Sequence, residues 1–83
     1  MRYSAMRTLL RKRGWNTYYD DDGDVCFRKG NAQLWVQRDE DGDPYIWDDE
    51  QEECYLDCIY RLIFTRQHMI IVWNDGDEWY YDY

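Results

Sequence analysis

The chain is poor in the residues that carry most enzymatic chemistry. Among its 83 residues it has one histidine, His68, one serine, Ser4, and no glycine-rich loop of the kind that cradles phosphates. A nucleophilic side chain needs an adjacent base, and Cys58 with His68 is the pair that could supply both. We therefore predict a non-enzymatic protein, with a small hydrolytic enzyme built on that pair as the alternative.

Long apolar runs and secretion signals are missing as well. No segment approaches the roughly 20 apolar residues that span a bilayer, and the first residues lead into a helical pattern without a signal peptide. The three cysteines are an odd number and do not suggest a disulfide framework. These absences predict a reduced, cytoplasmic protein that does not associate with membranes.

The cysteines also form a weak candidate metal site. Cys54 and Cys58 lie one helical turn apart, and Cys26 and His68 add two further side chains that bind metals. Structural zinc sites usually pair two closely spaced ligand units, and the chain has no second unit. We predict that the cysteines are small buried hydrophobic residues, and that the protein holds no metal and no cofactor.

Charge is distributed unevenly along the chain. Residues 1–13 contain five bases and no acid, whereas residues 14–83 contain five bases against all eighteen acids, a net charge of −13. A surface of that sign repels nucleic acids and membrane phosphates and attracts basic proteins. The alternative is that the acids only keep a chain rich in Trp and Tyr soluble.

Asp-Gly-Asp occurs three times, at 22–24, 41–43 and 75–77. Asp-Gly is a strong hairpin signal because glycine adopts positive φ without steric cost. The acids around the first two copies are also of the type that binds calcium, but the EF-hand pattern with its distant Glu is not met. We predict three hairpins with solvated acidic tips.

Hydrophobic periodicity predicts a single α+β domain with the order α-β-β-β-(β)-α-β-β. The predicted fold is one antiparallel sheet of five to six strands, packed by a main helix over 49–66 that carries a stripe of Leu56, Ile59 and Ile63. Pro44 suggests that 44–47 is an edge strand. Alternation in 32–38 places Trp35 on the solvent side of the sheet or under a segment that covers it. The predicted helices are 3–13 and 48–66, and the predicted strands are 15–20, 25–29, 32–38, 44–47, 68–73 and 78–83. The predicted core consists of Leu9, Leu10, Val25, Phe27, Leu34, Val36, Leu56, Ile59, Ile63, Ile71 and Trp73.

Several of these local patterns occur together in a known family. They are Gly14-Trp15 before the first strand, the segment DDGDVCFR at 21–28 across the first hairpin, and a helix at 49–66 followed by a hairpin over 70–81. In these features the chain resembles the small YbjN-like domains, which are related in fold to type III secretion chaperones. The resemblance implies a domain that grips another polypeptide.

The acidic and aromatic residues suggest a different kind of partner. Carboxylates spaced along a rigid sheet can imitate a phosphate array, and Trp and Tyr can anchor a protein interface. In size and charge the chain resembles small mobile-element inhibitors of host defence nucleases, including anti-CRISPR proteins. We predict an inhibitor that binds a basic, nucleic-acid-binding protein and no nucleic acid itself, with a chaperone-like adaptor as the alternative. Free strand edges at 44–47 or 78–83 would also allow a homodimer. The predicted partner-binding residues are Asp21, Asp22, Asp24, Trp35, Asp39, Glu40, Asp41, Asp43, Trp47, Asp48, Asp49, Asp75, Asp77, Glu78 and Trp79.

Overall fold

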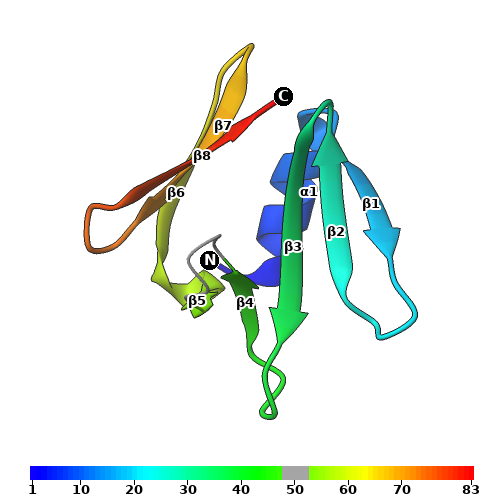
Figure 1. Cartoon of the computed structure of the whole chain (residues 1–83). Coiled ribbons are helices and arrows are strands. Elements are labelled where there is room, and N and C mark those ends of the chain that lie inside the picture. Colours follow the sequence, from blue (N-terminus) through cyan, green and yellow to red (C-terminus); the bar gives the residue numbers. More distant parts are fainter. Residues whose placement is uncertain (48–52) are drawn as a thin grey trace.

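The computed structural model describes residues 1–47 and 53–83, which form one α-helix and eight strands (Figure 1). The order is α1 (Tyr3–Lys12), β1 (Asn16–Tyr19), β2 (Val25–Lys29), β3 (Ala32–Arg38), β4 (Pro44–Trp47), β5 (Glu53–Tyr55), the single 3-10 turn η1 (Leu56–Cys58), β6 (Ile59–Phe64), β7 (His68–Trp73) and β8 (Glu78–Asp82).

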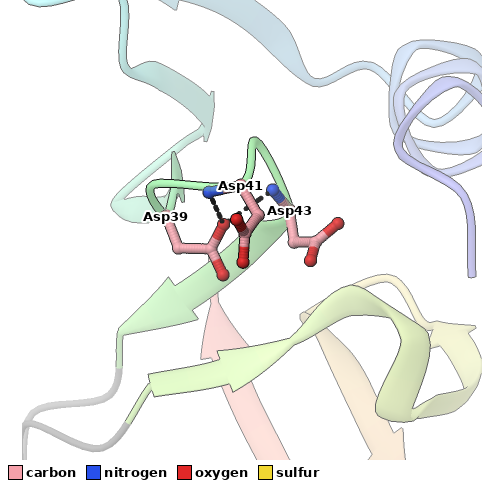
Figure 2. Close-up of side chains that lie close together, drawn as sticks. All are labelled: Asp39, Asp41 and Asp43. Atoms are coloured by element: carbon pink, nitrogen blue, oxygen red, sulfur yellow. Dashed lines mark hydrogen bonds between the residues drawn. The ribbon is translucent and has the colours of Figure 1, made fainter.

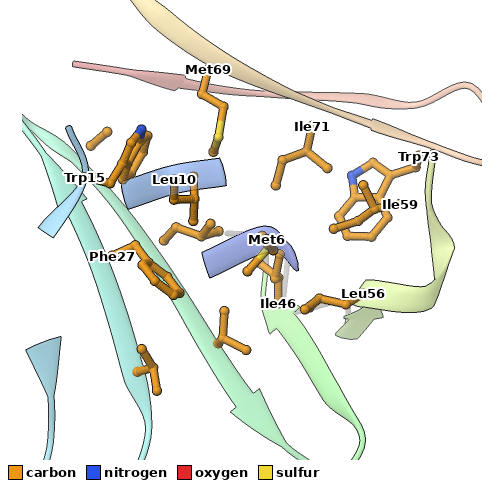
Figure 3. Close-up of a cluster of buried hydrophobic side chains, with 14 residues drawn as sticks. Met6, Leu10, Trp15, Phe27, Ile46, Leu56, Ile59, Met69, Ile71 and Trp73 are labelled. Carbon is orange, nitrogen blue, oxygen red and sulfur yellow. The ribbon is translucent and has the colours of Figure 1, made fainter. Parts of the chain in front are cut away.

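The strands form two antiparallel sheets rather than the single sheet predicted from the sequence. The larger has the order β1-β2-β3-β4-β5 and the smaller the order β6-β7-β8, so each is a simple meander. The helix α1 lies beside the five-stranded sheet, on the side that faces the three-stranded sheet (Figures 1 and 3). The prediction of an α+β fold is confirmed, but the packing helix is the N-terminal one.

The helix begins after Arg2 and is amphipathic. Its inward face carries Met6 and Leu10, which are fully buried and lie one turn apart. Leu9 points away from this face and is 38% exposed, so its predicted place in the core is wrong. Bases in the last turn, Arg11 and Lys12, lie where the partial negative charge of the helix end stabilises them.

All three Asp-Gly-Asp copies lie in hairpin turns of the same geometry. The turns span 20–24, 39–43 and 73–77, and join β1 to β2, β3 to β4 and β7 to β8. The glycine at the fourth position has φ of +85°, +84° and +94°, and its N–H donates to the first residue's carbonyl oxygen at 3.2, 3.0 and 3.0 Å. This is a three-residue hairpin loop with a left-handed glycine. The three predicted hairpins are confirmed.

One hydrophobic core joins the helix and both sheets (Figure 3). Phe27 lies near its centre, fully buried between β1 and β3, with its ring 6.2 Å from that of Tyr3. Most predicted core residues are buried, while Ile63 is only half-buried. The core residues that the sequence did not predict are Met6, Trp15, Ala32, Ile46 and Met69.

The predicted helix over 48–66 is wrong for the part that the structure describes. Residues 53–64 form β5, η1 and β6 instead, and residues 48–52 lie outside the described part of the chain. The helical spacing of Leu56 and Ile59 has a local cause, because a 3-10 turn also places residues i and i+3 on one side. A bulge between Ile59 and Arg61 then shifts the strand alternation of β6. The helix on which part of the resemblance to YbjN-like domains depended is therefore absent from 53–66.

Two smaller predictions also need correction. The strand β4 lies between β3 and β5 and is not an edge; Pro44 fits there because it is the strand's first residue. The strand β8 pairs only with β7 and does lie at a sheet edge. Of the three cysteines, Cys26 is buried as predicted, whereas Cys54 is half-buried in β5 and Cys58 is exposed in η1. No helix in the described ranges is long and apolar enough to cross a membrane.

Candidate functional site

Two of the acidic turns, 20–24 and 39–43, lie at the same end of the five-stranded sheet, and together they are called the acidic end. In a meander every second turn lies at the same end, so 20–24 and 39–43 are neighbours (Figure 1). The Gln37 side-chain amide donates to Asp24 Oδ2 at 2.9 Å and connects the end of β3 to the first turn. The acidic end collects eight carboxylates, of which Asp24 and Asp39 are half-buried and the rest exposed.

The first acid of each of these turns has a structural role. Asp20 Oδ1 accepts the backbone N–H groups of Asp22 and Asp24 at 3.0 and 2.8 Å. Asp39 Oδ1 does the same for the two equivalent residues, both at 2.9 Å (Figure 2). These two aspartates close the turns, and of the later acids all except the half-buried Asp24 are exposed.

The second turn also contains the one group of side chains that, among the described residues, could hold a metal ion. Carboxylate oxygens of Asp39, Asp41 and Asp43 lie within 4.8 Å of one another (Figure 2). Calcium takes about 6–8 oxygen ligands, and one Asp39 oxygen already accepts two backbone N–H groups. At least one oxygen of the cluster therefore serves to close the turn, and exposed acidic groups of this kind are common without a bound ion.

A tyrosine from β5 binds the remaining oxygen of this turn. The Tyr55 hydroxyl donates to Asp39 Oδ2 at 3.0 Å. This hydrogen bond, with the negative charge of Asp39, raises the pKa of Tyr55 to about 12. The backbone N–H of Asp43 is the main reason that the pKa of Asp39 is below its usual value, and the Tyr55 hydroxyl adds to that effect. The pair fixes β5 against the acidic end.

We expect this pair to appear in a tyrosinate absorbance titration. The folded pKa of Tyr55 lies above the unfolded value of 10.0, so its stabilising effect is present below pH 10 and is lost as the pH rises through about 12. The difference between the wild-type and Tyr55→Phe titrations should isolate a tyrosine that ionises near 12. Asp39→Asn should move that pKa back towards its ordinary value; an unchanged titration in Asp39→Asn would contradict the assignment.

A second surface, called the aromatic groove here, lies between the two sheets. It has a volume of about 860 Å³ and is lined by residues of β3, β4, β5 and η1 on one side and of β7, its following turn and β8 on the other. The lining residues are Gln33, Trp35, Trp47, Glu53, Cys54, Tyr55, Cys58, Trp73, Asn74, Asp75, Asp77, Trp79, Tyr80 and Tyr81.

The groove combines aromatic walls with acidic rims. Four of the chain's five tryptophans line it. Trp35 and Trp47 are 37% and 40% exposed, and the Trp73 and Trp79 rings lie 4.6 Å apart at an angle of 60°. Three lining residues are acidic, and none of the described residues that line the groove is Lys, Arg or His.

The bases gather elsewhere. Lys29 ends β2, at the opposite end of that strand from the first acidic turn, and its Nζ donates to the carbonyl oxygen of Arg13. Arg11 and Lys12 precede Arg13 in the last turn of α1. These four residues are called the basic cluster. Among the described residues, the basic cluster therefore lies at the end of β2 opposite the acidic end, while Arg38 lies beside the second acidic turn.

The structure divides the predicted partner-binding residues between the two surfaces. Asp21, Asp22, Asp24, Asp39, Glu40, Asp41 and Asp43 lie at the acidic end, and Trp35, Trp47, Asp75, Asp77 and Trp79 line the aromatic groove. Glu78 is exposed on β8 and accepts the Tyr80 hydroxyl at 3.2 Å, and its charge raises the pKa of Tyr80. Asp48 and Asp49 lie outside the described residues.

Sequence reasoning missed the groove residues of β5. Glu53 and Tyr55 belong to a three-residue strand, whereas the sequence predicts a helix there. The available signal was composition, because the segment from 53 to 64 contains Tyr, Ile and Phe, which favour strands. No family model, curated protein or solved structure matches this chain.

Proposed function

We propose that the protein is a non-enzymatic inhibitor that binds a basic, nucleic-acid-binding protein through its acidic end and the neighbouring aromatic side chains. The observation that supports this most directly is the gathering of two acidic turns at one end of a rigid sheet. The turns are closed by Asp20 and Asp39, so the positions of the exposed carboxylates are set by the backbone. A fixed array of negative charge can compete with phosphates for a basic groove.

The arrangement of bases supports the same proposal. Arg38 is the base at the end of β3 beside the second acidic turn, and its Nη1 donates to the Gly42 carbonyl oxygen at 2.7 Å. Its guanidinium also lies 5.3 Å from the Tyr3 ring. The basic cluster lies at the other end of β2. A basic partner would therefore meet concentrated negative charge, whereas nucleic acid and anionic membranes would be repelled.

The resemblance in size and charge to mobile-element inhibitors suggests that the partner is a host enzyme or complex in the cytoplasm. We expect such a partner to be retained on the immobilised protein at low salt and to elute in a salt gradient. Added DNA or RNA should release it, because both ligands would occupy the same basic surface.

Two charge-matched variants make this test specific. Asp21→Asn/Asp41→Asn removes two exposed carboxylates from the acidic end, whereas Asp57→Asn/Asp82→Asn removes two exposed carboxylates outside the acidic end and the groove. Exposed ion pairs contribute about 0.2–1 kcal/mol each, so the first variant should bind about 2- to 30-fold more weakly. The second should bind within about 2-fold of the wild type.

Other outcomes would contradict the proposal. Partners that are neutral or acidic, retention that is insensitive to salt, or equal losses in the two variants would each exclude an acidic-end inhibitor. Binding that survives both double variants and high salt but is abolished by Trp35→Ala would instead support the chaperone-like adaptor. Trp35 is suited to this comparison because it is on the outward face of β3 and 37% exposed.

A further inference from the structure

We propose that the aromatic groove binds an arginine side chain, presented by an extended basic segment of the partner protein. This inference rests on the proposed function, because it takes the partner to be basic. It adds a specific recognition site to the general attraction of the acidic end.

The chemistry of the lining carries the inference. The groove has tryptophan rings from both sheets, and its three acids come from both sides: Glu53 from β5, and Asp75 and Asp77 from the turn after β7. The faces of Trp and Tyr rings attract cations, and a nearby carboxylate adds a charged hydrogen bond. With no Lys, Arg or His among its described lining residues, the groove has no cation of its own to balance those acids.

The chain uses the same chemistry internally, but outside the groove. Among the described residues, four bases lie over aromatic rings: Arg13 over Phe64 at 5.1 Å, Arg28 over Tyr18 at 5.0 Å, Lys29 over Tyr83 at 4.4 Å, and Arg38 over Tyr3 at 5.3 Å. None of those four rings lines the groove. The bases of this protein that contact aromatic rings therefore do not contact the groove tryptophans. A cation from another molecule could do so.

The groove favours arginine over lysine and over a purely apolar segment. A guanidinium is planar, stacks on aromatic faces and forms two parallel hydrogen bonds with a carboxylate, whereas an ammonium group is a compact, strongly hydrated charge. Asp75 Oδ1 accepts the backbone N–H of Asp77 at 3.0 Å, but no base lines the groove beside the three exposed carboxylates among the described residues. An apolar segment would bury Glu53, Asp75 and Asp77 without a cation, which is unfavourable. An arginine side chain can stack on the aromatic rings and also form hydrogen bonds with the carboxylates.

The size of the groove indicates more than one side chain. Its volume of about 860 Å³ lies within the range of about 300–1,000 Å³ typical of sites that bury whole drug-sized ligands. An arginine together with the backbone of its flanking residues fills a groove of this volume better than a single side chain does. The occupant is therefore an extended segment with arginine at its centre.

The test uses three acetylated peptides of nine residues, in which Gly alternates with Arg, with Lys, or with the neutral arginine analogue citrulline. Binding is followed by tryptophan fluorescence and by the indole N–H signals in NMR spectra. We expect the Arg peptide to bind at least about 3-fold more tightly than the Lys peptide, and the citrulline peptide to bind least. The indole signals of Trp35, Trp47 and Trp79 should shift, while that of Trp15, which does not line the groove, should not.

A matched pair of variants locates the site. Glu53→Gln/Asp77→Asn neutralises two groove acids, and Asp21→Asn/Asp41→Asn neutralises two acids of the acidic end. The groove variant should weaken Arg-peptide binding about 3- to 10-fold, and the acidic-end variant by less than about 2-fold. Equal midpoints of thermal unfolding for the two variants and the wild type would show that neither change acts through folding.

The outcomes separate this inference from the proposed function. Equal binding of the Arg and Lys peptides, equal losses in both variants, or a shift of the Trp15 signal alone would overturn the arginine site, and the acidic-end inhibitor would stand. Arg-peptide binding in the groove, together with captured partners that ignore the acidic end, would overturn the inhibitor while the arginine site stands.

Discussion

Phe27→Ala is expected to lower the free energy of unfolding by about 3–5 kcal/mol. The ring is fully buried at the centre of β2, opposite Thr17 on β1 and Leu34 on β3, and near Tyr3 of the helix. Removing it deletes contacts with three elements at once and leaves a cavity that the sheet cannot collapse to fill. A chain of this length is stable by only about 4–12 kcal/mol, so the variant should be close to unfolding at physiological temperature.

Urea denaturation followed by tryptophan fluorescence measures this loss. Tyr19→Ala is the matched control, because Tyr19 ends β1 and is 63% exposed. Surface substitutions usually change stability by less than about 0.5 kcal/mol. A loss below about 1.5 kcal/mol for Phe27→Ala, or an equal loss for Tyr19→Ala, would contradict the position of Phe27 at the centre of the core.

Gly30→Ala is expected to cost about 2–5 kcal/mol, more than the same change at Gly23. Gly30 has φ of +57°, and an added Cβ would lie 2.8 Å from the backbone carbonyl carbon of Tyr83. Relief of this contact must move Tyr83, whose N–H donates to the Gln67 carbonyl oxygen at 3.0 Å and whose ring packs edge-on against Trp15 at 5.8 Å. The substitution at the β2–β3 turn thus also disturbs Tyr83, which directly follows β8 of the other sheet.

Gly23→Ala provides the comparison. Gly23 has φ of +85°, but nothing lies within 4 Å of the position of an added Cβ. Its cost should be that of the left-handed conformation alone, about 1–2 kcal/mol. Both variants are measured by chemical denaturation at one pH. Equal costs at the two glycines would mean that Tyr83 does not pack against the β2–β3 turn.

The features that were predictable from the sequence are those determined by neighbouring residues. The hairpins at 20–24, 39–43 and 73–77 follow from a glycine at the left-handed position. The inward and outward faces of β3 follow from simple alternation, which correctly placed Trp35 outside and Leu34 inside. The position of the acidic residues in two hairpin turns was therefore predictable from the sequence.

The second sheet depends on contacts that the sequence does not mark clearly. The strand β6 pairs with β7 through a connection at 65–67 that contains neither Gly nor Pro. Thr65 closes it, because its Oγ1 accepts the N–H of His68 at 3.1 Å. Because the sequence has no turn signal at 65–67, the apolar residues of β6 match the spacing of a helix as well as that of a strand.

The aromatic groove was not predictable for the same reason. Its residues come from β3 to β5, from η1 and from 73–81, and they meet only because the two sheets share one core. The sequence identified Trp35, Trp47 and Trp79 as candidate anchors, but it could not show that Glu53 and Asp77 lie on the same groove. That proximity depends on tertiary packing.

The separation of the acidic end from the basic cluster has a consequence for the kinetics of binding. Among the described residues, the opposite charges at the two ends of β2 form an electric dipole along that strand. In the field of a basic partner this dipole produces a torque that turns the acidic end forwards before the surfaces touch. The association rate constant should then fall steeply with ionic strength, whereas the dissociation rate constant, which depends on short-range contacts, should change little.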